Sequence, residues 1–172
     1  PQHVVSFPGV VLGCPCITQH PRYVEWSLRF AQAGYAIVMQ DSRGRYESEG
    51  KWRPYVDEAI DGYDTQEWLG RQDWCDGTIG TFGISYPGFT QILPAPLRSS
   101  YSRALVPIAN QEDNYGHLRY NGVLQQQNVM NWVWLGDRTN QNAARDLVDW
   151  DTVYRQLPLL TAIDDIADRP FY

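Results

Sequence analysis

Four short apolar runs, with helical spacing between them, constrain the fold of this chain more than any other feature of its sequence. The first run is bounded by Pro8-Gly9 and Gly13, which is typical of a buried strand. Alternating strands and helices favour a mostly parallel sheet with helices on both faces. The sequence therefore predicts an α/β fold. The four predicted strands are residues 10–12, 35–39, 78–84 and 103–108.

Helices are expected in the connections between these runs. Between the first two runs, Tyr23, Trp26 and Phe30 recur at spacings of three and four residues, and Gly34 follows as a stop signal. These apolar side chains share one helical face. A second helix is expected over residues 56–69, where acidic side chains occupy the first turn and suit the helix dipole.

Composition and charge exclude several classes of protein. The chain has 172 residues, 43% of them hydrophobic, which is enough for one well-buried core. Its 14 basic and 20 acidic residues give a net charge of −6, so nucleic acid and anionic lipid are not expected as partners. No apolar run approaches the roughly 20 residues of a bilayer span. Three cysteines, an odd number, do not suggest a disulfide framework.

The composition and the hydrophobic pattern of the sequence change after Asn110. Residues 110–172 are rich in Gln, Asn and Asp and contain no convincing strand, whereas residues 124–135 and 142–157 are helix candidates. We therefore expect a boundary near Ala109 between a sheet domain, residues 1–109, and a helical insertion. Because the chain starts inside an expected strand and stops without a closing element, we also expect it to be a segment of a longer protein.

The strongest local signal is the hexapeptide at residues 83–88, GISYPG, between a strand and a helix. A serine on such a tight turn projects its hydroxyl above the sheet edge, and the crowded turn requires a small residue two positions earlier, here Gly83. The second glycine of the usual pattern is replaced by Pro87, which suits a first helical turn. Taken alone, the hexapeptide fits a structural serine in a turn better than a nucleophile.

Further segments change this interpretation. Together with the hexapeptide they resemble, in order and spacing, the cocaine-esterase-like (CocE/NonD) serine hydrolases, which belong with the Xaa-Pro dipeptidyl-peptidases. The resemblance extends from about Pro8 to Ala109. It implies an α/β-hydrolase core that begins in residues 1–109, a helical cap that begins in residues 110–172, and a later jelly-roll domain. The matching segments are DSRGRYESEG (41–50), DGYD (61–64), EWL (67–69), QDWCDG (72–77) and GISY (83–86).

The resemblance assigns roles to three residues. Ser85 stands at the position of the acylated nucleophile, and the backbone N–H of Tyr86 would be one oxyanion donor. The second donor of the family is a tyrosine hydroxyl in a Pro-Tyr pair, where this chain has Pro15-Cys16. A thiol is a weaker donor on a shorter arm. Cys16 therefore indicates a weakened enzyme or a differently built oxyanion hole.

The chain lacks the rest of a catalytic triad in the expected order. In α/β-hydrolases the serine is followed by the acid and then the histidine. His3 and His20 precede Ser85, and His117 follows by only 32 residues, where a surface or substrate-facing role fits better. We expect the acid and the base beyond Tyr172, so the rest of its own chain is the main expected partner: the missing core strands, the triad Asp and His, and the jelly roll.

The nucleophile helix is interrupted early. Pro94 and Pro96 follow it closely, and a proline inside a helix costs about 3 kcal/mol. We expect this helix to end by Leu93. In the loop before the second helix, Asp41 and Arg43 are interpreted as residues that fix the loop beside the serine rather than as catalytic groups.

Other clusters receive structural interpretations. The three thiols are interpreted as buried or incidental, because zinc sites prefer wider spacing and a fourth ligand, and no cofactor is expected. The acids around the second helix are interpreted as a solvated face, and the tryptophans of the insertion as helix packing more than as a pocket for an aromatic acyl group. These groups are Cys14, Cys16 and Cys75; Asp57, Glu58, Asp61, Asp64 and Glu67; and Trp132, Trp134 and Trp150.

The leading hypothesis is a serine hydrolase that cleaves an ester or amide through an acyl-enzyme on Ser85, as an acyl esterase or acylase. An Xaa-Pro dipeptidyl-peptidase is the nearest alternative. A catalytically incomplete, hydrolase-like binding module is the third. The expected substrate is a small-molecule ester, an amide or a peptide, and the isolated segment is expected to be inactive because it lacks the base.

Overall fold

The computed structural model describes residues 7–14, 21–110, 119–125 and 149–155 of the chain. The chain divides into two compact units, Pro1–Asn110 and Gln111–Tyr172. Each is described by itself. Within the described residues, no helix is both long and apolar enough to cross a membrane.

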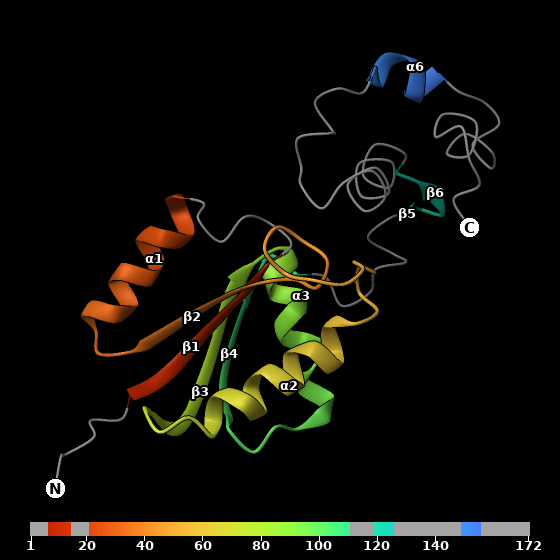
Figure 1. Cartoon of the computed structure of the whole chain (residues 1–172). Coiled ribbons are helices and arrows are strands. Elements are labelled where there is room, and N and C mark those ends of the chain that lie inside the picture. The colour runs from red at the N-terminus through yellow and green to blue at the C-terminus, as the bar shows by residue number, and fades with distance from the viewer. Residues whose placement is uncertain (1–6, 15–20, 111–118, 126–148, 156–172) are drawn as a thin grey trace, which may run out of the picture. The chain divides into compact units, whose positions relative to one another are not determined.

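The first unit is built on a four-stranded parallel sheet (Figure 1), which confirms the predicted α/β class. The strands lie in the order β2-β1-β3-β4, so the first strand of the chain lies in the interior of the sheet. Their bounds are β1 Phe7–Cys14, β2 Ala36–Asp41, β3 Cys75–Ile84 and β4 Ser102–Ile108.

Helices connect the successive strands, as predicted. Helix α3 ends just before Pro94, which confirms the expectation that it stops by Leu93, and a short 3-10 turn, η1, follows it. Helix α2 begins two residues later than predicted, after its N-cap Asp57. The bounds are α1 Pro21–Gln32, α2 Glu58–Gly70, α3 Tyr86–Ile92 and η1 Ala95–Leu97.

Alternate residues of β3 show which helices cover which face of the sheet. Phe82 makes edge contacts with Trp26 and Phe30 of α1, at centroid distances of 5.1 and 5.4 Å. Ile79 forms the buried core with Leu69 of α2, on the opposite face. Because successive side chains of a strand point to opposite faces, α1 covers one face and α2 covers the other.

Helix α3 lies on the same face as α2 (Figure 1). The Oγ1 atom of Thr81, two residues after Ile79 on β3, donates to Oε1 of Gln91 in α3 at 3.0 Å. The chain runs from β1 outward to β2 by way of α1, then returns across β1 to β3 and continues to β4. The direction of winding therefore reverses between β1 and β3, and ligands of open α/β sheets bind at the carboxyl ends of the strands beside such a reversal.

The second unit contains a short hairpin, β5 (Arg119–Tyr120) and β6 (Val123–Leu124). The prediction of no strand after Asn110 is wrong here. Asn121 and Gly122 form the turn with φ of 49° and 83°, the left-handed values that a tight hairpin turn requires. Leu124 belongs to β6, so no helix begins there, and residues 126–135 lie outside the described residues. Helix α6 (Trp150–Arg155) falls within the helix predicted over 142–157.

Candidate active site

Ser85 occupies a strained turn between β3 and α3. Its φ of 63° and ψ of −122° are values that residues other than glycine adopt at a cost of about 1–3 kcal/mol. Its N–H donates to the carbonyl of Ile108 at 2.8 Å, and its carbonyl accepts the N–H of Gly88 at 2.8 Å and Nδ2 of Asn110 at 3.1 Å. The residue is exposed. The turn thus presents a serine at the carboxyl edge of the sheet and is tied to the end of β4.

Two glycines make this turn possible. A Cβ atom on Gly83 would lie 2.4 Å from Cβ of Pro87 and 2.8 Å from the Pro87 carbonyl oxygen. The prediction that the position two residues before the serine must be small is therefore confirmed. Gly88 lies even closer to the side chain of Asn110, where a Cβ atom would overlap Oδ1. Strand β3, helix α3 and the end of β4 meet here without room for another methyl group.

Tyr86, the residue after the serine, is anchored in the interior. Its side chain is only 3% exposed. The hydroxyl donates to the carboxyl of Glu58, at the start of α2, and accepts the backbone N–H of Tyr55 at 3.2 Å. The ring packs against the rings of Tyr55 and Trp52, at centroid distances of 4.9 and 6.0 Å. Tyr86 therefore links the serine turn to the loop and helix that precede β3 in sequence.

Glu58 corrects the sequence interpretation of the acidic residues in and around α2. The expected solvated face is wrong for this residue, which is only 6% exposed. Burial raises the pKa of its carboxyl, against the smaller opposing effects of Tyr86 and Trp52. The reason is that the first turn of α2 packs beside α3, so the carboxyl faces a buried phenol. No spacing rule in the sequence connects two residues 28 positions apart.

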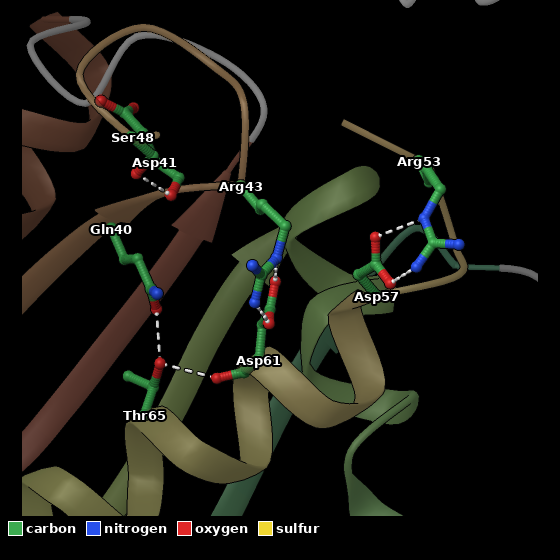
Figure 2. A network of polar contacts seen from close by, with 8 residues as sticks. All are labelled: Gln40, Asp41, Arg43, Ser48, Arg53, Asp57, Asp61 and Thr65. Atoms are coloured by element: carbon green, nitrogen blue, oxygen red, sulfur yellow. Dashed lines mark hydrogen bonds and ion pairs between the residues drawn. The ribbon is translucent and has the colours of Figure 1, made fainter. Parts of the chain in front are cut away.

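Two neighbouring acids of α2 and its N-cap pair with exposed arginines. The Asp57 carboxyl accepts a hydrogen bond from Nε of Arg53 at 2.8 Å (Figure 2), and this hydrogen bond lowers the pKa of Asp57. The Asp61 carboxyl likewise accepts a hydrogen bond from Nε of Arg43 at 2.9 Å. In both pairs, a second N–H of the arginine donates to the other oxygen of the carboxylate. The arginines are more than half exposed, so these pairs contribute little to stability on their own.

Arg43 fixes the loop of residues 42–57 to α2, which is the role expected from the sequence. Figure 2 shows the same loop tied to the end of β2: Oγ of Ser48 donates to the carbonyl of Asp41 at 2.7 Å. Nearby, the hydroxyl of Thr65 lies 3.0 Å from Oε1 of Gln40 and 2.7 Å from the carbonyl oxygen of Asp61. The loop that carries Trp52 and Tyr55 to the serine turn is thus held on both sides.

Arg45 is the most buried residue of this loop, at 1% exposure. Its guanidinium carbon lies 4.6 Å from the centre of the Trp52 ring and 5.4 Å from that of Tyr46. Burial lowers the pKa of Arg45. Stacking on two aromatic rings offsets part of the loss of hydration, and it orients Trp52, which packs against Tyr86. The sequence pattern identified this loop but not its arginine core.

Several predicted residues lie outside the described residues: Cys16, His3, His20, His117, Trp132 and Trp134. The described ranges contain no histidine, so the structure brings no imidazole to Ser85 within them. In those same ranges, no group of three or more His, Cys, Asp or Glu side chains is placed to hold a metal ion. Cys75, at the start of β3, is half-buried and free.

Comparison with known proteins decides the family. The model of the X-Pro dipeptidyl-peptidase (S15) family matches residues 14–169. The chain belongs to this family. It is also 33% identical over 153 residues to cocaine esterase of a Rhodococcus species, an alignment that covers 83% of this chain and 27% of that protein. The family resemblance predicted from the sequence motifs is confirmed.

Solved structures of other proteins share the fold. An aminopeptidase from a marine sediment archaeon, Thaumarchaeota archaeon, superposes with a TM-score of 0.70 at 24% identity, over 83% of this chain and 27% of that one. A CocE/NonD family hydrolase from Staphylococcus aureus gives a TM-score of 0.53 at 25% identity, over 61% and 22%. The chain spans about a quarter of the length of the relatives that it matches.

Proposed function

We propose that Ser85 is the nucleophile of a serine hydrolase that cleaves ester or amide bonds. The observation that carries the proposal is a strained, exposed serine at the carboxyl end of β3, in a member of the S15 family. In α/β-hydrolases such a turn presents the nucleophile above the sheet. The reversal of winding between β1 and β3 supports the proposal, because ligands of open α/β sheets bind at the carboxyl ends of the strands beside such a reversal.

The reaction proceeds in two steps. The Ser85 hydroxyl oxygen attacks the substrate carbonyl carbon while its proton passes to a base, and the base returns that proton to the departing alcohol or amine. Water then attacks the acyl-serine carbon and gives one proton to the base, which returns it to Ser85 as the acid leaves. Base and orienting carboxylate follow the serine in chain order in this fold. The described residues contain no histidine, so the base of this proposal lies outside them.

The negative oxygen of each tetrahedral intermediate is held by the backbone N–H of Tyr86. The second donor position is that of Cys16, whose thiol is a poor substitute for a phenol. Losing one such donor costs about 2.7–4 kcal/mol of transition-state stabilisation. The Tyr86 N–H therefore contributes more of the oxyanion stabilisation than it would with a tyrosine at position 16.

In this proposal, elements outside the described residues complete the site. Residues 1–109 form the start of the hydrolase core and residues 110–172 the start of its cap. The outer strand β4 exposes Leu105, Val106 and Ile108 by 40, 46 and 37%. In the described sheet β4 is an outer strand, and its exposed apolar side chains are suited to packing against further elements of the same protein.

The favoured substrate is a small-molecule ester or amide, with esterase or acylase activity, and the name of the cocaine esterase relative supports the ester. The name of the family supports a peptide substrate as the second candidate. A binding module without turnover is the third, since Cys16 weakens the oxyanion site.

Hydrolysis of a nitrophenyl ester by the full-length protein tests the proposal. We expect Ser85→Ala to lower kcat by at least about 10⁴-fold, because no acyl-enzyme forms. The matched control is Ser100→Ala, at an exposed serine in the turn before β4, which should keep full activity. Wild-type turnover that survives in Ser85→Ala would contradict the proposal.

A further inference from the structure

We propose that Glu58 and the backbone N–H of Tyr55 are positioning groups that hold Tyr86 so that its backbone N–H meets the oxyanion. The inference rests on the proposed function. It assigns a catalytic consequence to a buried contact between the start of α2 and the serine turn.

The two ends of Tyr86 lie in different surroundings. Its backbone directly follows Ser85 in the turn, whereas its hydroxyl lies in the interior between Glu58 and Tyr55. With 3% exposure, the side chain does not reach a substrate. Any influence of the phenol on the reaction therefore passes through the Tyr86 backbone, which makes this a positioning contact rather than a catalytic one.

The contact is fixed from several directions. The Glu58 carboxyl accepts a hydrogen bond from the Tyr86 hydroxyl, and the Tyr55 N–H donates a hydrogen bond to the hydroxyl oxygen at 3.2 Å. The rings of Tyr55 and Trp52 confine the Tyr86 ring. A ring held at its tip and along its sides leaves its own backbone little freedom to rotate. The peptide N–H between Ser85 and Tyr86 is therefore fixed before substrate arrives, as effective oxyanion stabilisation requires.

The arrangement is unfavourable for stability alone. Tyr55 adopts a φ of 66°, a left-handed value that a tyrosine rarely takes, and this conformation directs its N–H at the Tyr86 hydroxyl. Glu58 is buried, which raises the pKa of its carboxyl. A phenylalanine at position 86 would fill the same space and need neither a strained donor nor a buried acid. Orientation of residue 86 accounts for both features.

The composition of the oxyanion site adds a reason specific to this chain. Under the proposed function, Cys16 stands at the second donor position, and its thiol is a weaker donor than a phenol. A site that depends mainly on one N–H loses more from a small error in its direction than a site with two good donors. We therefore expect loosening of Tyr86 to affect turnover strongly.

The test uses the full-length enzyme, a nitrophenyl ester and phenylboronic acid, which forms a tetrahedral adduct on an active serine. We expect Tyr86→Phe to lower kcat about 10- to 30-fold, a fraction of the effect of losing a whole donor. KM should change less than twofold, and phenylboronic acid should bind more weakly by a factor similar to the loss in kcat. Tyr35→Phe, the same change in a tyrosine next to α1, is the matched control.

Variants of Glu58 separate positioning from packing. Glu58→Gln keeps an acceptor for the phenol and should keep most of the activity, whereas Glu58→Leu should match Tyr86→Phe. The double variant should be no worse than either single change, because both remove the same hydrogen bond. If Glu58→Leu does not fold, Tyr86→Phe and Glu58→Gln still decide the question.

Two results distinguish the inference from the proposed function. Full kcat and unchanged phenylboronic acid binding in Tyr86→Phe, with Ser85→Ala inactive, would overturn the inference alone. A loss of thermal stability in Tyr86→Phe without loss of kcat would overturn it as well. Activity that survives in Ser85→Ala would overturn the proposed function itself.

Discussion

The two faces of the sheet of the first unit are covered by side chains of different chemistry. Under α1, the contacts are made by aromatic rings, Trp26 and Phe30 against Phe82, and α1 itself has no buried residue. Under α2 and α3, the buried side chains include many polar groups: Glu58, Gln66, Thr81, Tyr86 and Gln91. The apolar face only covers the sheet, whereas the polar face orients the helix that begins after Ser85.

Gln91 illustrates the difference. It is 2% exposed, and its Nε2 donates to the carbonyl of Pro87 at 2.7 Å. Its Oε1 accepts Oγ1 of Thr81 and the N–H of Val106, both at 3.0 Å. One amide thus joins α3 to β3 and β4. Buried hydrogen bonds are directional, so they fix the orientation of the helix more strictly than apolar packing does.

The largest effect is expected when single methyl groups added on the two faces of β3 are compared. Gly83→Ala, on the α3 face, places Cβ against the backbone of Pro87 and should lower the free energy of unfolding by about 3 kcal/mol, with loss of activity. Gly80→Ala, on the α1 face, is the matched control, because its Cβ would meet atoms only at 3.9 Å or beyond. Urea unfolding and ester turnover measure both. Equal effects of the two changes would contradict the comparison.

Truncation of Phe82 tests the apolar face. Phe82→Ala removes the contacts with Trp26 and Phe30, and for this half-buried ring we expect a loss of about 2–3 kcal/mol in stability. The kcat of the folded enzyme should stay within about twofold, because no contact of Phe82 in the described structure reaches the serine turn. A large fall in kcat at a temperature where the variant is folded would show that both faces orient the turn.

Strain at Ser85 predicts that glycine at this position is more stable than alanine. Glycine adopts a φ of 63° freely, whereas alanine shares the strain of serine. We expect Ser85→Gly to be more stable than Ser85→Ala by about 1 kcal/mol, with both inactive. Thermal unfolding of the two variants side by side measures this difference. If alanine proves at least as stable as glycine, the strained geometry is wrong.

The smallest effect concerns pH. The folded-state pKa of Glu58 is raised, so its contribution to stability is fully present below the unfolded value and is lost as pH rises through the folded one. Asp57 has the opposite sign, but its lowered pKa confines its effect to acidic pH. Between the unfolded and the folded pKa of Glu58, wild-type stability should therefore fall with rising pH, and Glu58→Gln should reduce this slope.

This pH interval is free of titration by the other groups around Glu58. Tyr86 and Tyr55 both have raised pKa values, that of Tyr55 to about 12, and Arg43 and Arg53 stay charged throughout. Asp57→Asn should leave the slope in this interval unchanged. An identical slope in wild type and Glu58→Gln would mean that Glu58 titrates normally.

Local patterns predicted most of the first unit. The apolar run of residues 78–84, the small residue at Gly83 and the stop before Pro94 depend on neighbours in sequence, so the sequence alone revealed them. The role of Glu58 did not follow from any such pattern. Helical spacing places it among exposed acids, and only the packing of α2 beside α3 turns it toward Tyr86.

The hairpin of the second unit was missed for a different reason. Each of its strands is two residues long, too short for alternation of polar and apolar residues to appear. The Asn121-Gly122 pair was the available signal, since this dipeptide favours a two-residue hairpin turn. Turn chemistry, rather than strand pattern, would have identified it.

The most direct test of the account is the site of covalent labelling by a fluorophosphonate in the folded, full-length protein. We predict a single adduct on the peptide that contains Ser85, absent in Ser85→Ala and retained in Ser100→Ala. A folded protein that is not labelled, or a label on another residue, would contradict the assignment of Ser85 as the nucleophile.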